Sequence, residues 1–334
     1  MRTRIALSAL LAFFAFNMAN AQQLPQFSQY MNNPYVLNPA ASSLTHDIDI
    51  ALGIRQQWSG FDGAPQTYYV GGTINLGKRP ANQGKLYSIP ISHPGLLKSK
   101  PAVRYGKHVV GGLIARDEYG VFQRSSVMGS YSYHHPIGDN YWLSGGVSMG
   151  WYGFSFDRND IILENDFDNT YSDFIANGSN SNIFDINAGV YLYSDRAFLG
   201  YSVYQLGQNE INLGNEQSPL NLSDARLETH HYVTSGYRIT VADKIDLTPS
   251  FMLKIRPPAP LSVDINLMAE WDHRFRLGVS YRNQDAVSII LGANLTNYMR
   301  LAYAYDYVTS EINDLSSGSH EVVLGFQFNR KIKN

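Results

Sequence analysis

The chain lacks cysteine altogether and has little net charge. With no cysteine among 334 residues, the protein can form no disulfide and cannot carry the lipid-modified cysteine of a bacterial lipoprotein. The 26 Lys and Arg residues nearly balance 28 Asp and Glu, for a formal charge of −2, which does not fit a nucleic-acid-binding protein. We therefore expect that the chain is not a lipoprotein and that nucleic acid is not among its partners.

Long apolar runs are also missing, except at the start of the chain. Two early arginines, the apolar run Ile5 to Phe16 and the sequence Ala19-Asn20-Ala21 are the three parts of a secretory signal peptide. The run is shorter than the roughly 20 residues that a spanning helix needs. Residues 1–21 are therefore predicted to be a signal peptide cut after Ala21.

The sequence is rich in aromatic residues, and its apolar and polar residues alternate with a period of two. It contains 23 Tyr, 16 Phe and 28 Gly, while its mean hydropathy is −0.23. From about residue 46, apolar and polar residues alternate, as in strands with two unlike faces. In one such run Leu301 and Tyr303 take one face, and Arg300 and Asp306 take the other.

The length of these runs separates two all-β architectures. A soluble sandwich has strands of about five or six residues with a polar outer face, whereas most runs here reach roughly nine to thirteen, close to the 9–11 that cross a bilayer. The pattern predicts a transmembrane outer-membrane β-barrel over residues 46–330. The aromatic residues expected in its two interfacial girdles are Trp58, Tyr68, Tyr69, Tyr141, Trp142, Trp151, Tyr152, Trp271, Tyr281, Tyr298 and Tyr307.

We count about fourteen antiparallel strands, an even number, as single-chain bacterial barrels have. They are expected at residues 47–58, 66–77, 105–117, 122–135, 140–156, 183–193, 197–206, 228–240, 244–255, 261–271, 274–283, 286–295, 298–308 and 319–329. Most connections after even-numbered strands are short, as periplasmic turns are, and the long connections 157–182, 207–227 and 309–318 fall outside. The mature amino terminus is then expected in the periplasm.

One periplasmic connection, residues 79–104, is unexpectedly long and basic. No Asp or Glu occurs from position 78 to 107. The loop is either a solvated one that meets anionic lipid or peptidoglycan, or a docking site for an acidic periplasmic partner, because clustered charge steers such encounters. Its basic residues are Lys78, Arg79, Lys85, Lys98, Lys100, Arg104 and Lys107.

Residues 22–45 precede the first strand and are rich in proline and asparagine. Pro25, Pro34 and Pro39 fix their φ angles and push the residues before them toward extended conformations, so the segment is semi-rigid. Aromatic residues such as Tyr30 and Tyr35 need a dry environment. We expect a periplasmic segment that enters the barrel from below as a plug, or seals its mouth. The alternatives are a disordered leader and a partner-binding strand or hook.

The same segment resembles a known family. QFSQYMNNPYVLNPAAS, followed by RQQWSG, is similar to the amino-terminal signature of the PorP/SprF family of the type IX secretion system, although Ser42 and Ser43 stand where a small residue and a glycine are expected. The matching residues are Gln26, Phe27, Ser28, Gln29, Tyr30, Asn33, Asn38, Pro39, Ala40, Arg55, Gln57, Trp58 and Gly60. The resemblance implies an outer-membrane barrel that assists export of proteins with a C-terminal targeting domain, such as gliding adhesins. Its implied partners are those proteins and the periplasmic ring subunits, beside outer-membrane lipid.

No catalytic, metal or cofactor site is predicted. The pairs His134-His135 and His230-His231 cannot each chelate one ion, because adjacent strand residues point to opposite faces. No G-x-S-x-G elbow or Walker loop is present. A set of charged residues on the polar faces either forms a network across the lumen or lines water: Asp264, Glu270, Arg276, Arg282, Arg300 and Asp306.

The predicted function is a non-enzymatic component of type IX secretion. A passive channel or hydrophobic-solute transporter is the alternative from another class, for which an open lumen or a gap in the wall would be diagnostic. A structural anchor of the periplasmic ring is the third interpretation.

Overall fold

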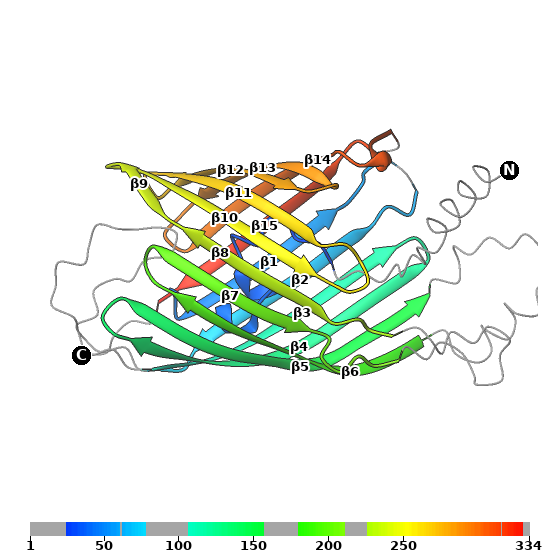
Figure 1. Cartoon of the computed structure of the whole chain (residues 1–334), viewed down its shortest axis with the longest axis horizontal. Coiled ribbons are helices and arrows are strands. Elements are labelled where there is room, and N and C mark those ends of the chain that lie inside the picture. Colours follow the sequence, from blue (N-terminus) through cyan, green and yellow to red (C-terminus); the bar gives the residue numbers. More distant parts are fainter. Residues whose placement is uncertain are drawn as a thin grey trace, which may run out of the picture.

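The strands of the computed structural model form one antiparallel sheet that closes on itself (Figure 1). Residues 25–60, 62–77, 106–156, 180–210, 226–314 and 316–329 are described. The strands are β1 (Ile48–Gln56), β2 (Gln66–Asn75), β3 (Lys107–Tyr119), β4 (Phe122–Ile137), β5 (Tyr141–Phe156), β6 (Asn180–Tyr193), β7 (Ala197–Tyr204), β8 (His230–Tyr237), β9 (Ile239–Ala242), β10 (Ile245–Ile255), β11 (Ser262–Trp271), β12 (Phe275–Arg282), β13 (Ala286–Asn294), β14 (Met299–Val308) and β15 (Ser319–Phe328).

The first and last strands pair to close the barrel, from Ile48↔Phe328 to Gln56↔His320. Both β8 and β9 pair with β10. Because those two strands share one position in the wall, the fifteen strands make fourteen wall positions, and the predicted all-β barrel with fourteen antiparallel strands is confirmed. Strand boundaries agree with expectation to within three residues. The largest differences are at β6, which begins at Asn180 rather than at residue 183, and at β8, which ends at Tyr237 rather than at residue 240 and is followed by the separate strand β9.

Helices are minor elements. The 3-10 helices η1 (Pro34–Val36) and η2 (Pro39–Ala41) precede β1, and η3 (Glu311–Asp314) precedes β15. Within the described ranges, no helix is long and apolar enough to span a membrane.

The two faces of the wall differ as the alternation predicts. In β1, Leu52 and Ile54 point outward and are 42% and 56% exposed, whereas Ala51 and Arg55 point inward and are buried. An exposed apolar outer face suits lipid. Neighbouring strand residues face opposite sides of the wall, so the two members of an aromatic pair cannot both lie in a girdle. The prediction of a girdle position was wrong for Tyr69, Trp142 and Tyr152, which are buried inside the barrel. Their neighbours Tyr68, Tyr141 and Trp151 are exposed.

The two ends of the barrel also differ. Four short turns lie at the end where β1 begins: they join β4 to β5, β6 to β7, β11 to β12 and β13 to β14. Two more, between β3 and β4 and between β12 and β13, lie at the opposite end, which also has the long connections from β5 to β6 and from β7 to β8. We call the end where β1 begins the turn end, and the opposite end, where β1 finishes at Gln56, the loop end. In outer-membrane barrels short turns face the periplasm, which places the loop end outside the cell.

Residues 25–47, here called the lumen segment, lie inside the ring of strands (Figure 1, darkest blue). Except for Pro34, residues 27–47 are all buried. Phe27, Met31 and Leu37 pack in one apolar cluster with inward-facing residues of many strands. The hydrophobic core of this protein is therefore the filled lumen. Residues 22–24 of the expected periplasmic segment lie outside the described residues.

Glycines in the wall make room for the lumen segment. A Cβ at Gly146 of β5 would lie 2.6 Å from the backbone nitrogen of Ala40 and 2.6 Å from the carbonyl carbon of Pro39. Gly189 of β6 meets the side chain of Asn38 in the same way. Real Cβ atoms do not come so close to backbone, so η2 docks at Gly146 only because a side chain is missing there; at Gly189 the close atoms are those of the Asn38 side chain.

Gly146→Ala should therefore weaken docking of η2, at a cost of about 1–3 kcal/mol, as for overpacking elsewhere. The neighbouring Gly145→Ala is the matched control, because a Cβ there has no atom within 4 Å. The measurement is the temperature at which the band of the folded barrel on SDS gels shifts to the mobility of the unfolded chain. Equal midpoints for the two variants would contradict the proposed contact.

Candidate functional site

The expected amino-terminal motif meets the barrel wall at the loop end. The backbone N–H of Ser28 donates to Glu321 Oε2 at 2.7 Å, and Ser28 Oγ donates to Asp306 Oδ2 at 2.7 Å. Gln29 Nε2 donates to the backbone oxygen of Glu321 at 2.9 Å. The motif is therefore hydrogen-bonded to both β14 and β15.

Arg55 joins the same group from β1. Its Nη2 lies 2.8 Å from Asp306 Oδ2 and its Nη1 lies 3.3 Å from Glu321 Oε2, while Nη1 also donates to Ser28 Oγ at 2.8 Å. The three charged side chains are at most 3% exposed. We call Ser28, Arg55, Asp306 and Glu321 the lumen latch: a buried cation shared by two carboxylates and the lumen segment.

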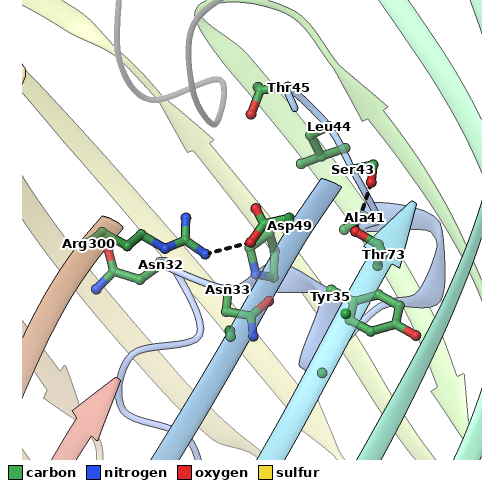
Figure 2. Close-up of a pocket in the computed structure, with 14 residues that line it drawn as sticks. Asn32, Asn33, Tyr35, Ala41, Ser43, Leu44, Thr45, Asp49, Thr73 and Arg300 are labelled. Carbon is green, nitrogen blue, oxygen red and sulfur yellow. Dashed lines mark hydrogen bonds and ion pairs between the residues drawn. The ribbon is translucent and has the colours of Figure 1, made fainter. Parts of the chain in front are cut away.

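The latch crosses the seam where the barrel closes. Arg55 lies on the first strand and Glu321 on the last, and the two strands pair at Arg55↔Glu321. A second polar connection crosses the seam nearer the turn end, where Arg300 Nη2 lies 3.1 Å from Asp49 Oδ1 (Figure 2) and Gln327 Nε2 donates to Asp49 Oδ2 at 3.0 Å. Charged lumen residues thus hold together the two ends of the sheet.

The aromatic residues of the segment lie in the buried environment that was expected for them. The ring of Phe27 packs edge-on against Tyr69, with centroids 5.2 Å apart. Asn266 Nδ2 donates to Tyr30 Oη at 2.5 Å. Both aromatic side chains are buried, and each has a partner on an inward face of the wall.

The asparagine motif fixes the middle of the segment. Asn38 Nδ2 donates to the backbone oxygens of Val190 at 3.1 Å and Tyr201 at 3.2 Å, while its Oδ1 accepts from the N–H of Ala40 at 2.9 Å and caps η2. Pro39 is the first residue of that helix. Its fixed φ and missing N–H suit this position.

Asn33 precedes η1 without capping it through its side chain. It lines a small cavity at the turn-end side of the segment, together with Tyr35 and Arg300 (Figure 2). Of the two serines that depart from the family pattern, Ser43 also lines this cavity, whereas Ser42 Oγ lies 2.5 Å from Ser132 Oγ of β4. Ser43 Oγ lies 2.8 Å from Thr73 Oγ1 and has a φ of 41°, a left-handed value that favours the glycine expected there.

The remaining motif residues shape the chain just beyond β1. The N–H of Gln57 donates to Pro65 O at 2.8 Å, and the N–H of Trp58 donates to Ser319 Oγ at 3.0 Å. Gly60 has a φ of 119°, which L side chains rarely adopt. Of this second motif, Arg55 is the residue with a hydrogen bond to the lumen segment.

The direction of the lumen segment differs from expectation. Gln26 Oε1 accepts from Arg282 Nη1 at 3.0 Å, and Arg282 is the last residue of β12, at the loop end. The N–H of Asp47 donates to Phe328 O at 3.1 Å, at the turn end. The described segment thus begins at the loop end and runs toward the periplasmic side. It does not enter from below, because the partners of its motif lie at the loop end.

The expected lumen charges have partners on the wall and on the lumen segment, and they form no ion pair across the lumen among the described residues. Arg282 lies 3.1 Å from Asp264 on the neighbouring strand and 2.8 Å from Asp285. Arg300 and Asp306 pair with β1, as described above, and Arg276 Nη1 donates to Asn32 Oδ1 of the segment at 3.0 Å. The expectation did not include the β1 partners or Glu321. The sequence could have revealed these residues, because the period-two alternation places Asp49, Arg55 and Glu321 on the inward faces of the first and last strands.

Most of the basic loop lies outside the described residues: Lys78, Arg79, Lys85, Lys98, Lys100 and Arg104. Lys107, which begins β3, has its Nζ 4.5 Å from the ring centroid of Trp142 and 3.5 Å from Leu44 O. This last cation of the run thus contacts the turn-end part of the lumen segment.

One group of side chains has the spacing of metal ligands. Asp246, Glu270 and His273 have ligand atoms within 4.8 Å of one another. However, Glu270 Oε1 lies 3.1 Å from His273 Nδ1, and Asp246 Oδ1 accepts from Thr240 Oγ1 at 2.7 Å. These groups have partners within the protein, and we assign no metal to them.

Comparison with known proteins connects these contacts with a family. A family model described as "Type IX secretion system membrane protein PorP/SprF" matches residues 19–326. No curated protein sequence matches significantly.

Several solved barrels are similar in structure at low identity. The CymD monoaromatic hydrocarbon channel is 8% identical with a TM-score of 0.47, covering 90% of this chain and 93% of its own. A Pseudomonas aeruginosa FadL homologue is 11% identical with a TM-score of 0.45, covering 93% and 96%. The Pseudomonas putida toluene transporter TodX is 9% identical with a TM-score of 0.47, covering 89% and 94%. Similarities this low carry no functional inference.

Arg55→Met should be strongly destabilising, because it leaves Asp306 and Glu321 buried without their cation; breaking such a pair costs about 3–5 kcal/mol. The triple variant Arg55→Met, Asp306→Asn, Glu321→Gln removes the charges together and should recover much of the loss. Urea unfolding in detergent micelles measures both. If the triple variant is as unstable as the single one, the latch does not stabilise the barrel through its charges.

Proposed function

Because the chain belongs to the PorP/SprF family of type IX secretion system membrane proteins, we propose that this outer-membrane barrel is a non-enzymatic component that binds protein partners at its mouths while its own lumen stays closed. The lumen segment acts as the plug. The partners are exported proteins with a C-terminal targeting domain and the subunits of the periplasmic ring.

The observation that carries this proposal is the packing of residues 27–47 inside the barrel. Their hydrogen bonds reach strands on all sides, including Tyr35 to Ser130 of β4 at 2.7 Å, Asn38 to Val190 of β6 and Tyr30 to Asn266 of β11. Cavities of about 20 and 50 Å³ lie beside the segment. Such volumes hold only a few water molecules, and a folded protein domain is far larger.

The energetics of the latch favour the closed state. Withdrawing the segment would remove the hydrogen bonds of Ser28 to Asp306 and Glu321, and each hydrogen bond to a charged group is worth about 1.5–3 kcal/mol. It would also expose the apolar cluster around Phe27 and Leu37. A closed lumen supports a role in holding partners, rather than in conducting them or small solutes.

Partner binding is then assigned to the two ends of the barrel. The basic loop connects β2 to β3 at the turn end, which we assign to the periplasm. From Lys78 to Lys107 it contains seven Lys or Arg residues and no Asp or Glu. An acidic periplasmic subunit is its best-matched partner.

The plug is tested by conductance. Reconstituted in planar bilayers, the native barrel should give no stable open-pore current, whereas a variant with residues 26–42 replaced by a Gly-Ser stretch of equal length should conduct. Asp62→Ala, an exposed change at the loop end, is the control and should remain silent. Steady conductance of the native protein would instead support a passive channel.

The docking role is tested by co-purification from detergent-solubilised outer membranes, with partners identified by mass spectrometry. The variant Lys98→Glu, Lys100→Glu, Arg104→Glu should lose most of its periplasmic ring subunits, because repulsion replaces attraction. Changing Lys98 and Lys100 to Arg keeps the charge and should retain them. Recovery of the native barrel without any secretion component would overturn the proposed function, and unchanged recovery by the Glu variant would overturn the docking role.

A further inference from the structure

The start of the lumen segment carries an inference about which side of the membrane can reach it. Pro25 and Gln26 are half-buried, whereas the next seven residues are buried. Gln26 contacts Arg282, the last residue of β12. Ser28 contacts Asp306 and Glu321, which lie near the loop ends of β14 and β15. Solvent access therefore increases toward the amino end of the segment, at the loop end.

The opposite end of the segment is held at the turn end. Asp47 bonds to Phe328, the last residue of β15, and Leu44 contacts Lys107, the first residue of β3. Between these points, Asn38 is fixed to β6 and β7. The chain therefore passes through the lumen once, from the loop end to the turn end, before β1 leads back through the wall.

The predicted signal cleavage after Ala21 leaves three residues before Pro25. An extended chain spans at most about 3.3–3.6 Å per residue, so these residues reach roughly 10 Å. That distance is too short to return through a membrane-spanning lumen whose apolar band is about 25 Å tall.

We infer that the mature amino terminus lies at the external mouth of the barrel, so that the lumen segment is accessible from the cell surface and not from the periplasm. A partner that pulls the plug must act from outside, on residues 25 and 26. A periplasmic subunit meets only the buried turn-end part of the segment. This inference concerns the direction of threading and does not depend on whether the proposed secretion partners bind.

Outward threading also constrains assembly. Ser28 and Gln29 bond to β15, while Arg55, which shares their partner Glu321, lies on β1. With β1 and β15 already paired, the segment would have to be threaded through a closed ring. The seam therefore closes around a segment that is already in place.

The absence of cysteine makes a direct test possible, since labels attach only at the cysteines that are introduced. Spin labels on Gln26→Cys with Asp62→Cys, at the loop end, should give a shorter distance than labels on Gln26→Cys with Asn140→Cys, in the turn between β4 and β5. Asp62 and Asn140 are both exposed, and the pair Asp62→Cys with Asn140→Cys calibrates the length of the barrel. The reverse order, or two equally broad distributions, would overturn the inference.

Gln26→Cys should leave the fold intact, because Arg282 keeps its contacts with Asp264 and Asp285. In intact cells, a membrane-impermeant biotin maleimide should label Gln26→Cys and Asp62→Cys, and label Asn140→Cys only after the outer membrane is permeabilised. Labelling of Gln26→Cys that follows the pattern of Asn140→Cys would overturn external access. Failed co-purification of secretion partners leaves both of these readouts unchanged, so the two proposals fail separately.

Discussion

The shared ion pair of Arg55 with Asp306 and Glu321 is the interaction on which the rest of the lumen depends. Its charges are buried, and buried charge is tolerated only with partners. Here one cation faces two carboxylates, and Ser28 of the lumen segment donates two further hydrogen bonds to them. Wall and segment therefore complete one another: the carboxylates of β14 and β15 need both Arg55 and the segment.

This dependence explains the inverted layout of the protein. The outer face is apolar because it meets lipid, so the packed core can form only inside the ring. There, small inward residues such as Ala51 and Ala304 leave space for Phe27, Met31 and Leu37. Gly146 brings the wall into backbone contact with η2, and Gly189 makes room for the side chain of Asn38. The lumen is thus built to fit one particular peptide, which is the chain's own amino-terminal segment.

The lumen segment contacts the strands that close the wall. The latch and the pair Arg300 with Asp49 both cross the β1 and β15 seam. Removing the segment would leave the seam with fewer polar partners, although its backbone pairing from Ile48 to Gln56 would remain.

The sequence by itself determined the architecture of the wall, because alternation with period two and strand length are local properties. Residues 299–308 and 319–328 show their two faces without any knowledge of neighbours, and fourteen such runs close into a barrel. The resemblance to a family signature marked the motif residues Ser28, Asn38 and Arg55. Only the tertiary structure decided which residues meet: Arg55 pairs with Glu321, 266 positions away in sequence. It also decided the direction of the lumen segment, since proline and asparagine stiffen a chain but do not specify which end of a lumen it enters. That choice depends on carboxylates brought together by barrel closure, and no local pattern records them.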